Sequence, residues 1–462
     1  MVFSSLIFIC VFLPIVLLVY NLSKNITYKN IVLSAASLVF YAWGEPVWVI
    51  LLVLSSITDY CHGLIIEKYR GKAGAKAALI SSLTINLGIL CLFKYSGFFA
   101  ESINGVLGTS FAAPQFTLPV GISFYTFQTL SYVVDVYKGK VNAQMSYLRY
   151  LTYLTMFPQL VAGPIVRYRD ISAEIRKRTV TSQEFADGAR RFVCGLTKKV
   201  LLANNAGAGA DAMLSAIHPT MLSSWLGIVL YTFQIYFDFS GYSDMAIGLG
   251  RMLGFKFKEN FEHPYVSRSV TEFWRRWHIS LSSFFRDYVY IPLGGNRRRH
   301  ILNILIVWSL TGLWHGASMN FVFWGLFFGI ILIIEKKLFG GVLQKLPFPI
   351  CHMYTMLVVM AGWTLFYFTD MTQMLRTVRA MAGIGVRAYD LTAVSGLCKY
   401  AWVAAVCFFA SMPWPKILYR HFINTKHIAA SFVEPIVLIV GFGLCMMMLA
   451  GQSYNPFLYF RF

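Results

Sequence analysis

Long apolar stretches separated by short, mostly basic loops recur along the whole chain. A hydrocarbon core of about 30 Å requires roughly 20 apolar residues in a spanning helix, and eleven stretches approach or reach that length. The pattern predicts one all-α, multi-pass membrane domain over residues 1–462. The predicted spanning helices cover residues 2–21, 30–43, 46–65, 77–97, 117–137, 222–240, 301–316, 319–335, 350–369, 398–412 and 433–451.

The basic loops predict the orientation of the helices and single out one segment. The loop that contains Lys24 and Lys29 and the loop 67–76 are both basic, which predicts that they lie in the cytoplasm and that the N-terminus lies outside. Basic residues flank both ends of the apolar stretch 147–166, which therefore cannot cross the membrane once. The prolines and glycine in "MFPQLVAGPIVRYRD" (156–170) indicate a re-entrant hairpin. Irregular backbone at membrane depth is tolerated where protein or a water-lined cavity satisfies it, so we expect a cavity nearby.

Two further segments mix basic and aromatic residues into an apolar pattern. They are "FADGARRFVCGLTKKVLLANN" (185–205) and "EFWRRWHISLSSFFRDYVYIPLGGNRRRH" (272–300). Tryptophan, tyrosine and arginine favour the headgroup region of a bilayer. We expect both segments to form helices that lie in the cytoplasmic interface instead of crossing the membrane.

Composition agrees with a membrane protein and excludes several other classes. The 462 residues are 57% hydrophobic and only 13% charged. The net charge of +20 would suggest nucleic acid in a soluble protein, but these basic residues lie in loops that face anionic lipid headgroups. We therefore expect membrane lipids as partners and no nucleic acid. The eight cysteines form no CxxC pair, so neither a disulfide framework nor a metal site is indicated.

His315 lies in "TGLWHGAS" (311–318), within a stretch that has no Lys, Arg, Asp or Glu from Ile301 to Ile334. Such a histidine is often a hydrogen-bonded core residue. In a bilayer, however, polar groups are costly and usually face a cavity or pathway. Trp308, Thr311 and His315 would form one stripe of a helix. Gly312 and Gly316 form a small-xxx-small pair that would allow a second helix to approach closely.

His278 is the second candidate, with Trp274 one helical turn before it on the expected same face. Alone, His278 would be interpreted as an interfacial histidine. Two histidines in a His-poor membrane region could act as a base and its partner in acyl transfer. Metal ligation is the alternative, but no HxxxH, CxxC or carboxylate cluster supports it.

The segment "FDFSGYSDMAIGLG" (237–250) places Asp238 and Asp244 beside Tyr242 in an apolar context. Either the acids are satisfied inside a glycine-kinked helix by arginine or backbone amides, or they line a polar cavity. The sequence leaves both alternatives open. No GxSxG elbow, P-loop or GxGxxG motif supports hydrolase, ATPase or dinucleotide chemistry.

At these residues the sequence resembles the membrane-bound O-acyltransferase (MBOAT) family, in particular its bacterial branch that O-acetylates alginate. The resemblance is densest over residues 118–335 and includes one departure, Phe284, where the family often has tryptophan. The resemblance implies a bundle of about eleven spanning helices, with re-entrant and interfacial helices, around a central tunnel. The matching motifs are "LPVGISFYTFQTLSYVVDVYKGK" (118–140), "FPQLVAGPIVRYRD" (157–170), "FDFSGYSDMAIGLGRMLGF" (237–255), "FWRRWHISLSSFFRDYVYIPLGGNR" (273–297) and "LTGLWHG" (310–316).

The resemblance also implies roles for individual residues. The family's invariant histidine corresponds to His315, the expected general base, and its second motif histidine to His278. The residues expected to line the substrate tunnel are Trp274, Trp277, Thr311, Trp314, Asp238 and Tyr242. The residues expected to contact the phosphates of the donor are Arg167, Arg169 and Arg297.

The implied reaction is transfer of an acetyl group in the plasma membrane of a bacterium. The donor would be a cytoplasmic thioester such as acetyl-CoA, used as a substrate, with no bound cofactor. The acceptor hydroxyl would belong to an extracytoplasmic polysaccharide or to an esterase-like partner protein. Two alternatives are D-alanyl or other acyl transfer to teichoic acid, and a non-catalytic transporter of polysaccharide or lipid. The segment "YIPLGGNR" (290–297) favours polysaccharide O-acetylation, and the lack of an internal repeat disfavours a transporter.

Overall fold

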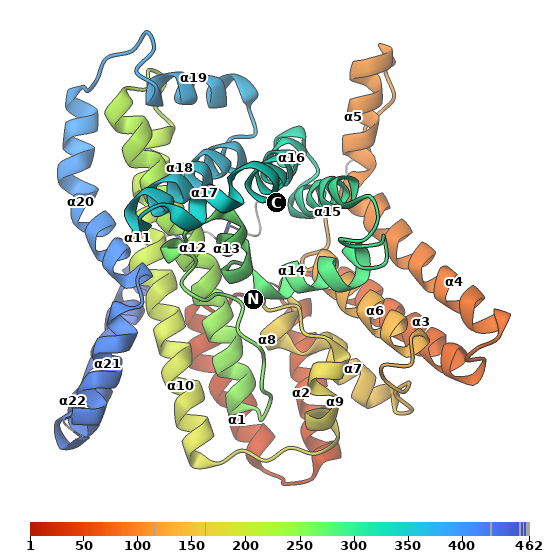
Figure 1. Cartoon of the computed structure of the whole chain (residues 1–462). Coiled ribbons are helices and arrows are strands. Elements are labelled where there is room, and N and C mark those ends of the chain that lie inside the picture. Colours follow the sequence, from red (N-terminus) through yellow and green to blue (C-terminus); the bar gives the residue numbers. More distant parts are fainter. Residues whose placement is uncertain (115, 162, 426, 452–453, 456, 459–462) are drawn as a thin grey trace. The chain divides into compact units, whose positions relative to one another are not determined.

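A computed structural model describes residues 1–114, 116–161, 163–425, 427–451, 454–455 and 457–458. All the regular secondary structure assigned in these ranges is helical (Figure 1). The chain forms two compact units, which are described separately below. The first unit comprises Met1–Phe192 and Met245–Lys258. The second comprises Val193–Asp244 and Glu259–Phe462. The expectation of one domain over the whole chain stays a prediction.

The first unit begins with a π-helical turn, Phe8–Phe12, which runs directly into α1. Its helices pack around an aromatic cluster that includes Phe8 and Phe157, whose ring centroids are 6.1 Å apart. The Asn25 side chain caps α2 by accepting a hydrogen bond from the Thr27 amide at 2.8 Å. The helices are α1 (Leu13–Asn21), α2 (Ile26–Ala42), α3 (Trp48–Lys68), α4 (Ala73–Leu90), α5 (Ser96–Leu107), α6 (Ile122–Tyr137), α7 (Tyr147–Thr155), α8 (Phe157–Leu160), α9 (Tyr168–Arg176) and α10 (Ser182–Thr197).

The interruption predicted near Pro158 is present in the first unit. Helix α7 ends at Thr155, α8 is a single turn, and non-helical backbone follows from Gly163 to α9. A Cβ at Gly163 would lie 2.7 Å from the Cα of Gln159, so the close turn requires glycine. The broken helix is confirmed, whereas its re-entry into a membrane stays a prediction.

The second unit contains the segments that carry both candidate histidines. The π-helical turn Lys198–Ala203 follows α10 directly and leads into α11, and the long α12 ends in the first unit. Helices α15 and α16 form an antiparallel hairpin, against which α18 packs. The helices are α11 (Asn204–Leu214), α12 (Met221–Met252), α13 (Val270–Arg276), α14 (Ile279–Phe285), α15 (His300–His315), α16 (Met319–Ile334), α17 (Gly340–Lys345), α18 (Phe348–Tyr367), α19 (Met371–Met381), α20 (Leu391–Ser411), α21 (Trp414–Thr425) and α22 (His427–Gly451).

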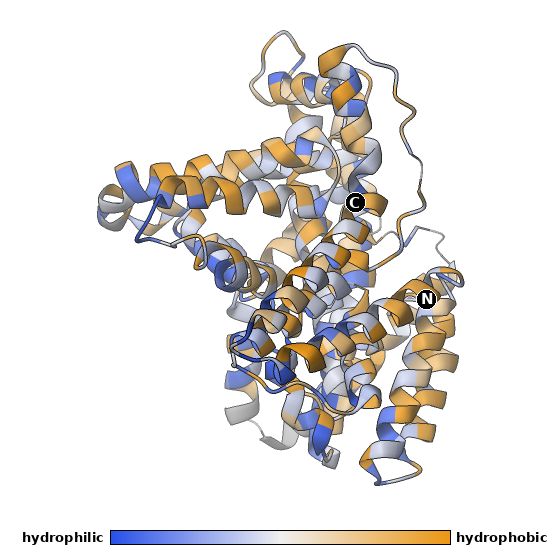
Figure 2. Cartoon of the chain, turned by 90° about the vertical axis from the view of Figure 1, so that its right-hand side faces the viewer, coloured by the Kyte–Doolittle hydropathy of each residue, from blue (hydrophilic) through white to orange (hydrophobic). Residues whose placement is uncertain are grey.

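Each of the eleven predicted apolar ranges lies largely on a helix. Apolar residues line much of these helices, while polar residues gather mainly in the loops (Figure 2). Among the residues that the structure describes, five segments are long and apolar enough to cross a membrane: Trp48–Lys68, Ala73–Leu107, Phe348–Tyr367, Leu391–Ser411 and Phe432–Gly451. Shorter apolar helices include Phe8–Asn21, Ile26–Ala42 and His300–His315. The number of helices that actually cross stays a prediction.

Candidate active site

Close contact between α15 and α16 positions His315. A Cβ at Gly312 would collide with the carbonyl oxygen of Phe321, and the Cα of Gly325 lies 3.3 Å from that Cβ position. The predicted close approach at Gly312 is therefore confirmed, and Gly325 is its partner on α16. Helix α15 ends at His315, because Gly316 adopts an extended backbone. The imidazole is thus held where the hairpin turns.

Aromatic rings surround the His315 side chain, which is only 5% exposed. The centroid of its ring lies 5.1 Å from that of Trp324 and 5.2 Å from that of Phe366, both edge-on. Trp314 lies between the two histidines, with ring centroids 5.0 Å from His315 and 5.8 Å from His278. These contacts restrict the orientation of the His315 ring and keep bulk water away from most of it.

His278 lies at the junction of α13 and α14, in left-handed backbone with φ of 44°. Asn260 holds this junction, since its carbonyl accepts from the Ile279 amide at 2.9 Å and its side chain accepts from the Ser280 amide at 3.1 Å. The expectation that Trp274 and His278 share one helical face is wrong. Helix α13 ends at Arg276, and the chain turns before His278.

A buried carboxylate anchors the other end of α13. Glu335 accepts hydrogen bonds from the amides of Val270 at 2.6 Å and Thr271 at 2.8 Å. A negative charge at a helix N-terminus is stabilised by the unpaired amides there. Glu335 follows α16 directly, so the end of α16 fixes the start of α13. The hairpin that carries His315 therefore also orients the helix that leads to His278.

Both histidines line one cavity of about 240 Å³. Its walls come from α13, α14, α15 and α16, together with the π-helical turn Arg286–Tyr290. The turn between α13 and α14 brings Trp274 and His278 to the same cavity although they do not share a helical face. The lining residues are Thr271, Trp274, Arg275, Trp277, His278, Leu281, Ser282, Phe285, Arg286, Tyr290, Ile304, Val307, Trp308, Thr311, His315 and Leu332.

The His278 ring is electrically neutral at physiological pH. Burial lowers its pKa from 6.5 to about 3, because the charged imidazolium would lose its hydration. Among the residues that the structure describes, neither the Nδ1 atom of His278 nor the indole nitrogen of Trp274 has a hydrogen-bond partner. A buried polar atom without a hydrogen-bond partner destabilises the fold by about 1–3 kcal/mol, and proteins often keep such an atom where function requires it. Both atoms therefore retain unused hydrogen-bonding capacity beside the cavity.

The predicted tunnel residues divide into two groups. Trp274, Trp277 and Thr311 line the cavity, and Trp314 touches both histidine rings. Asp238 and Tyr242, on α12, are not among the lining residues. Their part in a tunnel stays a prediction.

The acids of α12 have lysine partners, which the sequence analysis did not identify. The carboxylate of Asp238 lies 2.6 Å from Lys199 Nζ, with both side chains almost fully buried, and it also accepts from the Leu458 amide at 2.8 Å. Asp244 pairs with Lys198 at 2.6 Å. The alternative in which these acids are satisfied inside the fold is therefore supported, by lysine instead of arginine. A sequence signal existed, because Lys198 and Lys199 lie in an otherwise apolar stretch.

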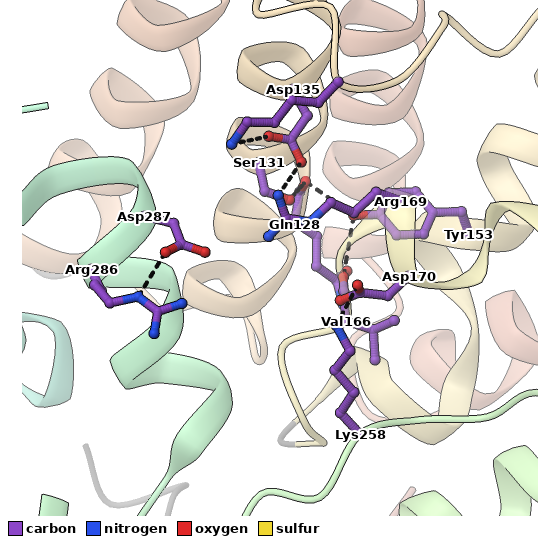
Figure 3. Close-up of polar contacts among 11 residues, drawn as sticks. Gln128, Ser131, Asp135, Tyr153, Val166, Arg169, Asp170, Lys258, Arg286 and Asp287 are labelled. Carbon is purple, nitrogen blue, oxygen red and sulfur yellow. Dashed lines mark hydrogen bonds and ion pairs between the residues drawn. The ribbon is translucent and has the colours of Figure 1, made fainter. Parts of the chain in front are cut away.

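The three arginines expected to contact donor phosphates are not all free. Arg169 lies 3.8 Å from Asp135 in the first unit, near the pair that Asp170 forms with Lys258 (Figure 3). Arg167, in the same unit, is buried, and Arg297, in the second unit, is exposed in the loop before α15. Arg297 is not among the residues that line the cavity. The assignment of these arginines to phosphate stays a prediction.

Comparison with known proteins identifies relatives of the whole chain. The model of the membrane-bound O-acyltransferase family matches residues 142–376. A probable alginate O-acetylase of Pseudomonas putida is 38% identical, and one of Pseudomonas aeruginosa is 36% identical, each aligned over the full length of both chains. A peptidoglycan O-acetyltransferase of Helicobacter pylori is 32% identical over 83% of this chain and 80% of its own length. The chain therefore belongs to the membrane-bound O-acyltransferase family and is a multi-pass membrane acyltransferase.

Proposed function

We propose that the protein transfers an acetyl group from a cytoplasmic thioester, such as acetyl-CoA, to a hydroxyl of an extracytoplasmic polysaccharide or of a partner protein that passes the group on. The full-length relatives named as probable alginate O-acetylases support the acyl group and the class of acceptor. The observation that carries the proposal is that His278 and His315 line the same cavity. In the bacterial plasma membrane, about eleven spanning helices would surround a tunnel that connects this cavity to both faces.

His315 acts as the general base in this proposal. A thioester is already activated, so the reaction chiefly requires removal of the proton from the attacking hydroxyl. The hydroxyl proton moves to a ring nitrogen of His315 while the oxygen bonds to the carbonyl carbon. The tetrahedral oxyanion then collapses, the carbon–sulfur bond breaks, and the imidazolium returns its proton to the leaving thiolate. The aromatic surroundings of His315 support this role, because they hold the ring in one orientation.

His278 orients the reacting groups. Its neutral ring can donate a hydrogen bond to the acyl carbonyl, where negative charge develops in the transition state. The indole nitrogen of Trp274, a donor without a partner among the described residues, could supply a second such hydrogen bond. Their shared position on the cavity wall supports this arrangement.

The decisive experiment compares His315→Ala with wild-type protein reconstituted in nanodiscs with a radiolabelled acetyl thioester and the acceptor. Positioned base catalysis contributes about 100-fold to 10,000-fold, and we expect kcat to fall by that factor without loss of the folded protein. His421→Ala is the matched control, because His421 is exposed on α21 and does not line the cavity. Full turnover by His315→Ala at normal protein level would contradict the proposal.

Mass spectrometry of the modified acceptor tests the acyl group itself. An acetyl ester that disappears with His315→Ala supports the proposal, whereas a D-alanyl ester would support the alternative in which teichoic acid is the acceptor. Membership of an acyltransferase family disfavours transport without covalent chemistry. Radiolabel recovered only as unreacted thioester across the membrane would favour transport.

A further inference from the structure

Among the residues that the structure describes, the charged ones on the wall of the histidine cavity are basic. The lining includes Arg275 and Arg286 but no aspartate or glutamate. His278 on the same wall is neutral at physiological pH. The two guanidinium groups therefore make the cavity attractive to a negatively charged group.

Arg275 has no acidic partner among the described residues. It is exposed at the C-terminal end of α13, and it forms no ion pair within the part of the chain that the structure describes. Its neighbour Arg276 differs, because it pairs with Glu272 at 2.8 Å and does not line the cavity. Arg276, which does not line the cavity, is thus neutralised, whereas the lining residue Arg275 has no ion pair among the described residues.

Arg286 is only partly neutralised. Its Nε atom donates to Asp287 at 2.8 Å, and its side chain is 63% exposed (Figure 3). Among the described residues, the terminal nitrogens of Arg286 have no hydrogen-bond partner. A guanidinium group held at Nε can still present its two terminal nitrogens to an oxyanion.

We propose that Arg275 and Arg286 bind an oxyanion group of the substrate and so position its reactive part near His315. The ligand chemistry is a phosphate of the thioester donor or a carboxylate of an acidic polysaccharide acceptor. This inference rests on the proposed function, because it assigns a substrate contact to the same cavity. It also assigns anion binding to arginines other than the Arg167, Arg169 and Arg297 expected from the sequence. The assignment follows from the shared cavity wall, the absence of acids on it and the available guanidinium nitrogens.

The test measures binding and turnover separately, with the full chain in nanodiscs. Arg275→Gln and Arg286→Gln are compared with wild type for equilibrium binding of coenzyme A and of a uronic acid oligosaccharide. We expect affinity for one of these probes to fall about tenfold, as for the loss of one charge-assisted hydrogen bond. The corresponding KM should rise by a similar factor while kcat changes less than about twofold. Arg275→Lys and Arg286→Lys should recover part of the affinity, since they keep the charge.

The probes distinguish the two sources of the oxyanion. Weaker binding of coenzyme A, with unchanged binding of dephosphorylated acetyl-pantetheine, identifies a donor phosphate. Weaker binding of the uronic acid oligosaccharide, with unchanged binding of a neutral oligosaccharide, identifies an acceptor carboxylate. Arg298→Gln is the matched control, because Arg298 is exposed in the same unit and does not line the cavity. Its affinities should equal those of wild type.

Unchanged binding of both charged probes in the Gln variants would overturn the inference, and the two arginines would then serve lipid headgroups. An equal loss with the charged and neutral probes would also overturn it, because that pattern indicates a distorted cavity. The proposed function fails separately, if wild type shows no acetyl transfer that depends on His315. The binding measurements decide the role of the arginines in either case.

Discussion

His278 occupies left-handed backbone, which is uncommon for residues other than glycine, although asparagine, aspartate and histidine adopt it more often than the rest. Its sequence context, "FWRRWHIS", contains no glycine or proline, so no local signal announces the turn. The turn depends on Asn260, which is 18 residues earlier in the chain and satisfies two amides after His278. The sequence singles out both histidines as candidates, whereas the geometry at His278 depends on this tertiary contact.

Burial of His278 predicts how stability depends on pH. Its pKa in the folded protein is about 3, against 6.5 when exposed, so the unfolded chain binds the extra proton first as pH falls. Stability conferred by the neutral ring is therefore full above pH 6.5 and declines as pH falls from about 6.5 toward about 3. Between pH 6.5 and 5 the expected loss is about 2 kcal/mol. Thermal melts should show a shallower decline for His278→Gln than for wild type, and parallel declines would contradict the assignment.

Hydropathy predicts individual helices, but it does not predict which residues face each other where two helices pack. The apolar periodicity predicts the helices α15 and α16, and the spacing of Gly312 and Gly316 predicts a close neighbour. Gly325, the partner on α16, carries the same signal through its small-xxx-small spacing with Gly329, but the sequence does not show which helix faces this pair. The same limit applies to Glu335, since a lone acid after an apolar helix does not indicate which helix N-terminus it caps.

The crossing of α15 and α16 is sensitive to a single methyl group. Gly312→Ala places a Cβ against the backbone of Phe321, which cannot rotate away, so the helices must separate. We expect a loss of about 1–3 kcal/mol in unfolding free energy, as for other overpacked positions. Gly443→Ala on α22 is the matched control, because no atom lies within 4 Å of the new Cβ. Denaturant unfolding in detergent measures both, and an equal stability of the two variants would argue against the close crossing.

At the scale of the whole molecule, the Lys199–Asp238 pair joins the segment after α10 to α12, and the Leu458 amide adds a third segment. The sequence could show that Asp238 needs a partner, but it could not show which of 40 basic residues supplies it. Long-range pairs of this kind depend on topology. Hydropathy predicts where helices lie along the chain and does not predict which of them meet.

Breaking the buried pair should be far more harmful than breaking an exposed one. Lys199→Met leaves the Asp238 charge buried without its cation, and we expect a loss of about 3–5 kcal/mol. The double variant Lys199→Met, Asp238→Asn should recover much of that loss, because no unpaired charge remains. Lys258→Met is the control: Lys258 is largely exposed beside Asp170, and its loss should cost less than about 1 kcal/mol. Thermal melting of the purified variants measures these losses. A double variant as unstable as Lys199→Met would show that the unpaired Asp238 charge is not the cause of the instability.

The bond from the Leu458 amide to Asp238 spans 220 positions and therefore has a consequence for biogenesis. The ribosome synthesises α12 long before residue 458, so Asp238 in the nascent chain lacks one of its final hydrogen-bond donors. Until then, the interior of the second unit contains an acceptor that lacks its last donor. Chains that stop short of residue 458 would keep this defect permanently, which gives the quality-control proteases of a cell a structural mark of incomplete synthesis.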